Sequence, residues 1–288
     1  MATIVSRLTN TGSLLVNGNF DEITQSTISA NTNTILSSTF DEVSNSGISI
    51  ARRDCANGTV QISGIFDEFT GAPVVDSALT LWVDSGQISS YPESGSTWND
   101  LSGNSNNFTL VNSPTFNKFD SGGSLRFTNT SSQYGTGSGT PVGINAYTKS
   151  IWFKLNGITD NNLLSSSVGG HFMFFGGTTK LYSGHTAWAG FPTTYASAAN
   201  FSVGVIYHVG LTFDTTNGMT LYINGVQDST YSTIKTGVSG TGQCNIGSFA
   251  PGGNLLNGVI YQAMIYNRVL TADEIAQNFN ALRRRFNI

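Results

Sequence analysis

The chain has 288 residues, of which only 10% are charged, with a net charge of −4, whereas 97 are Ser, Thr or Asn. Helices expose Ala, Glu, Lys and Arg on their outer faces, so this composition argues against helical bundles, coiled coils and α/β folds. Because 39% of the residues are hydrophobic, the chain can bury a core, and its many short polar residues favour an all-β protein with tight turns.

The first 75 residues contain a repeat. The motif Phe-Asp-Glu occurs three times, and the first and third copies align without gaps at an offset of 46 residues. Apolar and polar residues alternate around these two copies, as in strands with one buried face. One unit of about 20 to 26 residues is too small to bury that face alone, so units must stack on one another or on other chains.

We therefore predict a β-repeat over residues 1–75 that anchors or oligomerises the chain; the alternative is a small accessory sheet in a monomer. Although carboxylates are natural calcium ligands, no copy has the ligand density of a calcium loop, so no metal is expected there. The candidate assembly residues are Phe20, Asp21, Glu22, Phe40, Asp41, Glu42, Phe66, Asp67 and Glu68.

Residues 76–288 contain closely spaced strand signals and one convincing helix. The Asn-Gly pairs at 217–218 and 224–225 are typical of hairpin turns. Thr271 and Glu274 form a capping box that predicts a helix start, and an apolar stripe runs from Ile275 to Phe286. The strand-like segments are 151–155, 203–213 and 219–223.

These segments carry a resemblance to a known family. The hairpin over 209–226 and the ending 256–275, which includes IYNRVLTADEI, resemble the laminin-G-like, concanavalin A-like lectin/glucanase superfamily. The opening, residues 79–104, is similar to the form found in bacteriophage and other viral structural proteins, and the upstream repeat looks like the N-terminal segments of marine-phage virion proteins. The resemblance covers about 210 residues.

The resemblance implies a jelly-roll of two large antiparallel sheets. The predicted fold class is therefore all-β: an N-terminal β-repeat segment, then a concanavalin A-like jelly-roll β-sandwich over 76–288 with a short C-terminal helix. The resemblance to the family also implies that Asp214 or Asp228 could bind a structural calcium ion. The alternative is that both are turn residues, because aspartate is common in turns. No other cofactor is expected.

Few residues in the predicted sandwich are suited to catalysis. Glycosidases on such a fold need two carboxyl groups roughly 5 to 9 Å apart. Residues 76–288 contain only two glutamates, Glu93 and Glu274, and no Glu-x-Asp-x-x-Glu motif. The three histidines are well separated, and no Gly-x-Ser-x-Gly motif has plausible partners. We therefore predict no catalytic residue and no enzyme; a glycan-degrading enzyme is the less favoured alternative.

The stretch 181–195 interleaves aromatic and small polar residues. Aromatic rings stack on sugars while hydroxyls and amides hydrogen-bond to them. The alternative is that these aromatics belong to the core or to a subunit interface. The carbohydrate-binding candidates are Tyr182, His185, Trp188, Phe191 and Tyr195.

These features together predict a structural protein of a bacteriophage virion (capsid decoration, head fibre or tail fibre) that displays a lectin-like sandwich on the particle exterior. The alternative is a carbohydrate-binding module for host recognition or adhesion. The expected partners are other virion proteins, further copies of the chain, with a trimer favoured, and host surface glycans. Neither nucleic-acid binding nor membrane insertion is expected, since the one basic cluster is Arg283–Arg285 and no apolar stretch is long enough. The start lacks a signal-peptide pattern, which predicts synthesis in the host cytoplasm and a place in the virion.

Overall fold

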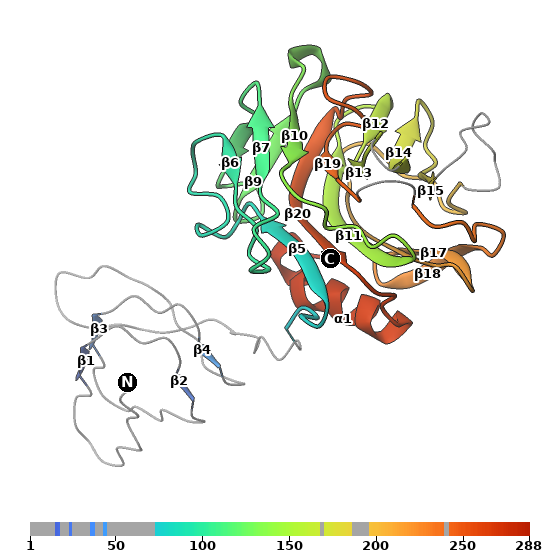
Figure 1. Cartoon of the computed structure of the whole chain (residues 1–288). Coiled ribbons are helices and arrows are strands. Elements are labelled where there is room, and N and C mark those ends of the chain that lie inside the picture. The colour runs from blue at the N-terminus through green and yellow to red at the C-terminus, as the bar shows by residue number, and fades with distance from the viewer. Residues whose placement is uncertain are drawn as a thin grey trace. The chain divides into compact units, whose positions relative to one another are not determined.

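The computed structural model describes residues 73–167, 170–185, 196–238 and 242–288, together with four short strands upstream (Figure 1). The chain divides into two compact units, Met1–Ala72 and Pro73–Ile288. No helix in the described part of the chain is long and apolar enough to cross a membrane.

The upstream strands pair in a pattern that matches the repeat. They are β1 (Leu15–Asn17), β2 (Ile23–Thr24), β3 (Ile35–Ser37) and β4 (Val43–Ser44). β1 pairs in parallel with β3, and β2 pairs in parallel with β4, each at a shift of 20 residues. The first two Phe-Asp-Glu copies have the same spacing. The nine candidate assembly residues themselves lie outside the described residues.

The second unit is a sandwich of two layers, which confirms the predicted fold class. In the layer that we call the back layer, a single sheet has the strand order β18-β17-β16-β11-β20-β9-β8, and β5 also pairs with β20. The strands of this layer are β5 (Leu79–Asp84), β8 (Thr115–Asn117), β9 (Ser124–Phe127), β11 (Ala146–Leu155), β16 (Ile206–Asp214), β17 (Gly218–Ile223), β18 (Val226–Tyr231) and β20 (Gly258–Tyr266).

The front layer consists of two smaller antiparallel sheets, in the orders β13-β19-β10-β7-β6 and β12-β14-β15. A bridge between Ser166 and His171 joins them. The strands are β6 (Thr97–Trp98), β7 (Phe108–Val111), β10 (Tyr134–Gly137), β12 (Asp160–Asn162), β13 (Leu164–Ser165), β14 (His171–Gly176), β15 (Tyr182–His185) and β19 (Asn245–Ile246). A short 3-10 helix, η1 (Asn129–Ser131), precedes β10.

The main core lies between the two layers. Strand alternation sends Ile151, Phe153 and Leu155 of β11 inward, while Trp152 and Lys154 face out. Each fully buried large apolar side chain contributes about 1.5–3 kcal/mol through removal of its surface from water. Other members of this core are Leu81, Trp98, Phe108, Met173, Phe175, Leu211, Ile246 and Ile265.

The predicted hairpin forms as β16 and β17, and the chain turns again into β18. Asn224 and Gly225 both have positive φ, 50° and 80°, as a two-residue turn with the strand twist requires. The strand predicted from 203 begins only at Ile206. Gly204 has a φ of 81°, and its N–H donates to the carbonyl of Leu155 at 2.8 Å, which turns the backbone before the strand starts.

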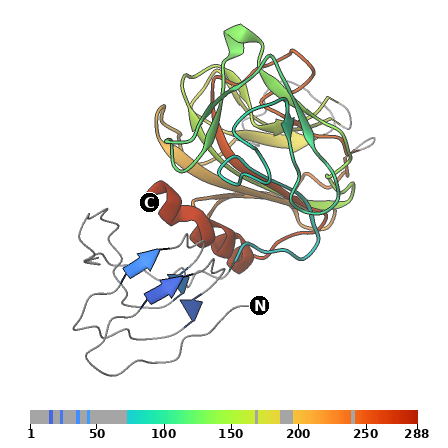
Figure 2. The same ribbon diagram turned by 90° about the vertical axis from the view of Figure 1, so that its left-hand side faces the viewer.

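The predicted helix forms as α1 (Ala272–Leu282), followed by the 3-10 turn η3 (Arg283–Phe286). Its capping box is present, with Thr271 and Glu274 bonded to each other's backbone N–H groups. The helix lies outside the strands (Figure 2), on the outer side of the back layer. There Trp152 stacks with Phe279 and Phe286, with ring centroids 5.6 and 4.2 Å apart.

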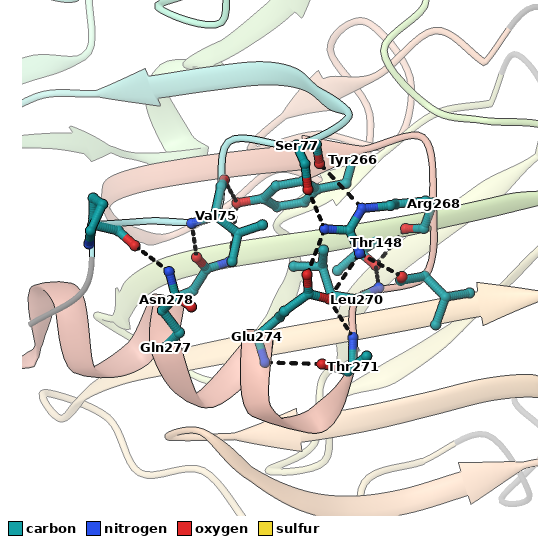
Figure 3. A network of polar contacts seen from close by, with 12 residues as sticks. Val75, Ser77, Thr148, Tyr266, Arg268, Leu270, Thr271, Glu274, Gln277 and Asn278 are labelled. Atoms are coloured by element: carbon teal, nitrogen blue, oxygen red, sulfur yellow. Dashed lines mark hydrogen bonds and ion pairs between the residues drawn. The ribbon is translucent and has the colours of Figure 1, made fainter.

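Residues 73–75, which the sequence analysis placed in the N-terminal region, pack against α1 (Figure 3). Val75 N–H donates to Asn278 Oδ1 at 2.8 Å, and the hydroxyl of Tyr266 donates to the carbonyl of Val75 at 2.9 Å. Gln277 Nε2 donates to the carbonyl of Pro73 at 2.6 Å. The start of the second unit is therefore bound to its C-terminal helix.

Candidate functional site

A straight row of small polar side chains crosses the outer side of the front layer. In the strand registers Thr97 lies opposite Thr109, Thr109 opposite Thr136, Thr136 opposite Asn245, and Asn245 opposite Ser165. Directly opposed residues project to the same face of a sheet, so these five side chains form one line across five strands. We call these five residues the polar row.

Local sequence explains why the row faces outward. In β10, Tyr134 and Thr136 alternate with Gly135 and Gly137, and only the glycines face the core. A Cβ at Gly135 would collide with the side chain of Ile246, so the two glycines allow the front layer to pack closely on the interior. Tyr134, half-buried, consequently stands beside Thr136 on the outer side.

Three aromatic side chains continue this outer side onto the second front sheet. Phe172 and Phe174 of β14 lie with ring centroids 5.4 Å apart, edge to face. Phe174 is 5.6 Å from Tyr182 of β15, its cross-strand neighbour. Ser165, at the end of the polar row, bonds through its hydroxyl to the backbone of Met173 between the two phenylalanines. We call the polar row, Tyr134, Phe172, Phe174 and Tyr182 together the front face.

The front face consists entirely of uncharged side chains, and its accessibility changes along its length. Thr97 and Thr109 are exposed, and Thr136 is half-buried. Asn245, Phe174 and Ser165 are buried, with 3%, 4% and 0% exposure. Asn245 Nδ2 donates to the carbonyl of Phe249 at 3.4 Å, but its Oδ1 has no partner among the described residues. Hydroxyl and amide groups next to aromatic rings can hydrogen-bond to sugar hydroxyls while the rings stack on sugar faces.

Of the two predicted binding residues that the structure describes, one lies on the front face. Tyr182 lies there, half-buried, but His185 points to the opposite side of β15. His185 Nδ1 accepts from the hydroxyl of Tyr147 at 3.2 Å, Nε2 bonds to the carbonyl of Thr236, and burial lowers the pKa of the imidazole to about 4. The remaining candidates, Trp188, Phe191 and Tyr195, lie outside the described residues.

Sequence reasoning did not select Tyr134 or the polar row. The signal that could have found Tyr134 and Thr136 is the strict alternation Tyr-Gly-Thr-Gly, in which glycine occupies every inward position. The row as a whole depends on registers between segments as far apart as Thr97 and Asn245, which no local pattern shows.

The two aspartates considered for calcium are occupied by hydrogen-bond donors. Asp214 Oδ1 accepts from the backbone N–H groups of Thr216 and Asn217, and Asp228 accepts from those of Ala198 and Ala199. Across the described ranges, no group of three or more His, Cys, Asp or Glu side chains is placed to hold a metal ion.

The two glutamates of the sandwich have separate partners. Glu93 lies 3.9 Å from Lys118 at the surface. Glu274 accepts two hydrogen bonds from Arg268, at 2.7 and 2.8 Å, and this guanidinium together with the helix cap lowers the pKa of Glu274 to about 2.

The fold and the front face together define a lectin-like β-sandwich. The chain belongs to the concanavalin A-like lectin/glucanase superfamily, whose family model matches residues 128–276, just over half of the chain. No curated protein sequence matches it.

Several solved structures share the fold. Trypanosoma rangeli sialidase aligns with a TM-score of 0.54 at 15% identity, covering 75% of this chain and 34% of the sialidase, so the chain spans about a third of that enzyme. Domain 4 of AbnA, a GH43 extracellular arabinanase from Geobacillus stearothermophilus solved with arabinotriose, aligns with a TM-score of 0.54 at 18% identity, covering 69% of this chain and 97% of that domain. The binding domain of Paraclostridial Mosquitocidal Protein 1 aligns with a TM-score of 0.50 at 16% identity, covering 72% of this chain and 52% of that chain. At these identities the likeness establishes the fold alone.

These comparisons correct the prediction that the chain is not an enzyme. That prediction rested on the scarcity of glutamates in a lectin-like fold. The same fold occurs in chains of glycan-acting enzymes, a sialidase and an arabinanase, so scarcity of carboxylates on one such domain does not exclude a glycan-active protein.

Proposed function

We propose that the chain is a carbohydrate-binding protein and that glycans bind at the front face. The observation that carries this proposal is the continuity of the polar row with the aromatic residues Tyr134, Phe172 and Tyr182 on one side of the sandwich. Membership of the lectin/glucanase superfamily supports it, as does the arabinotriose complex of the similar arabinanase domain.

The shape of the row indicates how a glycan would lie. Its accessible part consists of Thr97, Thr109 and Thr136, because Asn245 and Ser165 are buried. At about 4.8 Å per strand, these three strands span about 10 Å, which suits a short oligosaccharide crossing the strands. Tyr134 would stack on a ring while Thr136 and Thr109 hydrogen-bond to its hydroxyls. Because every side chain of the front face is uncharged, nothing on it offers an ion pair, which favours neutral glycans over acidic ones.

The test is binding of glycans to the full chain and to matched variants. A glycan array selects a ligand, and calorimetry then measures its affinity for Tyr134→Ala and Thr136→Val. We expect each substitution to weaken binding at least tenfold, or about 1.4 kcal/mol. Thr115→Val, on the exposed outer side of back-layer strand β8, is the control and should leave the affinity unchanged. An array without any ligand, or equal affinities for all variants, contradicts the proposal.

We also propose that the sandwich is displayed on a virion, as a decoration or fibre protein that recognises host glycans, and that the N-terminal repeat attaches it there. The resemblance of residues 79–104 to viral structural proteins supports this, and the parallel registers of β1 with β3 and β2 with β4 support a unit that stacks. Antibodies against the sandwich should then label intact particles, and the purified chain should sediment as an oligomer, with a trimer expected. If the antibodies do not label particles, or if the purified chain sediments as a monomer, the proposed place on a virion is contradicted.

A further inference from the structure

A network of basic and polar side chains lies inside the sandwich, directly behind the aromatic end of the front face. Lys149 of β11 is fully buried, and its ammonium donates to the carbonyl of Leu164 and to His171 Nδ1, both at 2.8 Å. Tyr147, two residues earlier on the same face of β11, donates to His185 Nδ1 at 3.2 Å. The network thus connects the back layer to β13, β14 and β15.

The hydrogen bonds define the protonation of both imidazoles. His171 Nδ1 accepts from an ammonium, so its proton must be on Nε2, which donates to the carbonyl of Gln243 at 2.7 Å. His185 likewise accepts at Nδ1 from Tyr147, and its Nε2 donates to the carbonyl of Thr236. Each histidine therefore fits the network as the neutral tautomer.

No acidic group faces this network within the described residues. Tyr147 and Lys149 belong to it from the back layer, and Phe213 of β16 lies edge-on to His185 at 4.3 Å. From the front layer, Cys244 lies near Tyr147 and Lys149. Burial raises the pKa values of the Tyr147 hydroxyl and the Cys244 thiol, so neither supplies a negative charge near neutral pH. Lys149 is therefore a buried cation without a carboxylate partner.

We propose that this network is an acid-sensitive latch that holds β14 and β15 against the back layer and releases them when His171 and His185 become protonated. A proton on His171 Nδ1 would stand 2.8 Å from the Lys149 ammonium and replace a hydrogen bond by repulsion. His185 is the direct cross-strand partner of His171, so a second proton would add a third cation to the same interior. Without a nearby anion, opening is the available relief.

Burial and the neighbouring Lys149 ammonium both lower the pKa values of the two histidines. Burial, with Lys149 as a second cause, lowers the pKa of His171 well below its ordinary value and that of His185 to about 4. In an opened state both would titrate near 6.5. The opened state then binds more protons, so the opening equilibrium rises about tenfold per pH unit for each histidine as pH falls below 6.5, down to the pKa of the closed state.

The effect of the latch on glycan binding rests on the proposed function, because β14 and β15 carry Phe172, Phe174 and Tyr182 of the front face. Opening would displace Phe172, Phe174 and Tyr182 while leaving Thr97, Thr109 and Thr136 of the polar row in place. Glycan would therefore be released as the pH falls.

The test is hydrogen exchange of the full chain between pH 7.5 and pH 4.5, corrected for the intrinsic rate. Amides of β14 and β15 should lose protection at least tenfold per pH unit below 6.5, while those of β11 and β16 stay protected. The double variant His171→Gln, His185→Gln keeps an acceptor and a donor at both places without titrating, and its β14–β15 profile should be flat.

His208→Gln is the matched control, because His208 is also fully buried but lies on the outer side of the back layer, bonded to Ser150. It should leave the β14–β15 profile unchanged. An unchanged profile in the double variant, or loss of protection in β11 and β16 together with β14 and β15, overturns the latch. Hydrogen exchange needs no ligand, so failure to bind any glycan would count against the proposed function and leave the latch standing.

Discussion

Arg285 and Asp84 form an ion pair that binds the C-terminal turn to the first strand of the sandwich, with Arg285 Nη1 at 2.7 Å from Asp84 Oδ1. The side chain of Asp84 is only 2% exposed. The same guanidinium donates to the carbonyls of Ser121 and Gly123, so it fastens the turn between β8 and β9 as well. Three segments distant in sequence therefore depend on one side chain.

Replacing that guanidinium should be costly. Arg285→Met leaves the buried carboxylate of Asp84 without its cation, and we expect a loss of about 3 kcal/mol in the free energy of unfolding. Urea denaturation measures it. Arg126→Met removes an exposed arginine that makes no hydrogen bond to any of the described residues, and it should change stability by less than about 0.5 kcal/mol. Equal effects of the two substitutions would show that the ion pair does not stabilise the fold.

Because of Lys149, the free energy of unfolding should depend on pH in the alkaline range. Burial lowers its pKa from 10.5 to about 8, so between these values the unfolded chain binds a proton that the folded chain does not. Stability should therefore rise as the pH is raised from 8 to about 9, above which the Cys244 thiol, whose pKa burial raises to about 11, acts in the opposite direction. In Lys149→Met this rise should disappear, whereas Lys154→Met, which removes a partly exposed lysine paired with Asp120, should retain it. Identical slopes in the two variants would contradict the assignment.

Gly137 should be intolerant of any side chain. A Cβ at this position would collide with the backbone carbonyl of Cys244 on the neighbouring segment, which cannot rotate away. We expect Gly137→Ala to cost about 1–3 kcal/mol through overpacking of the front layer. Gly253→Ala is the comparison, since the nearest atom to its Cβ would be 3.8 Å away. Thermal unfolding of both variants is sufficient, and similar melting temperatures would rule out the close approach.

Asn278 should matter far more than its neighbour Gln277. Asn278 is fully buried and accepts from Val75 N–H while donating to the hydroxyl of Tyr266 at 3.0 Å. Asn278→Ala strands a buried N–H, at a cost of about 2 kcal/mol. Gln277→Ala removes one exposed hydrogen bond to Pro73 and should cost about 0.5 kcal/mol. Chemical denaturation that ranks them the other way would contradict the role of Asn278.

Local sequence patterns predicted correctly those structural features that depend on residues close together in the chain. The capping box at Thr271 and the turn at Asn224 depend on neighbouring residues, and both form as predicted. These features follow from side-chain chemistry within a few residues.

The candidate site was harder to predict because it depends on register. Tyr182 and His185 are three residues apart, and within a strand an odd spacing puts two side chains on opposite faces. That conclusion needs the bounds of β15, which the sequence did not show. In a chain with 97 Ser, Thr and Asn residues, Thr136 and Asn245 also do not stand out until five strands bring them into line.

The attachment of residues 73–75 to α1 has a mechanical consequence. Tension transmitted along the chain into the sandwich at Pro73 arrives first at the side chains of Gln277 and Asn278. β5 and its pairing with β20 come later along the same path. Under traction from the N-terminal side, the contacts of the C-terminal helix with residues 73–75 are therefore expected to break before the strand pairing of the sheets.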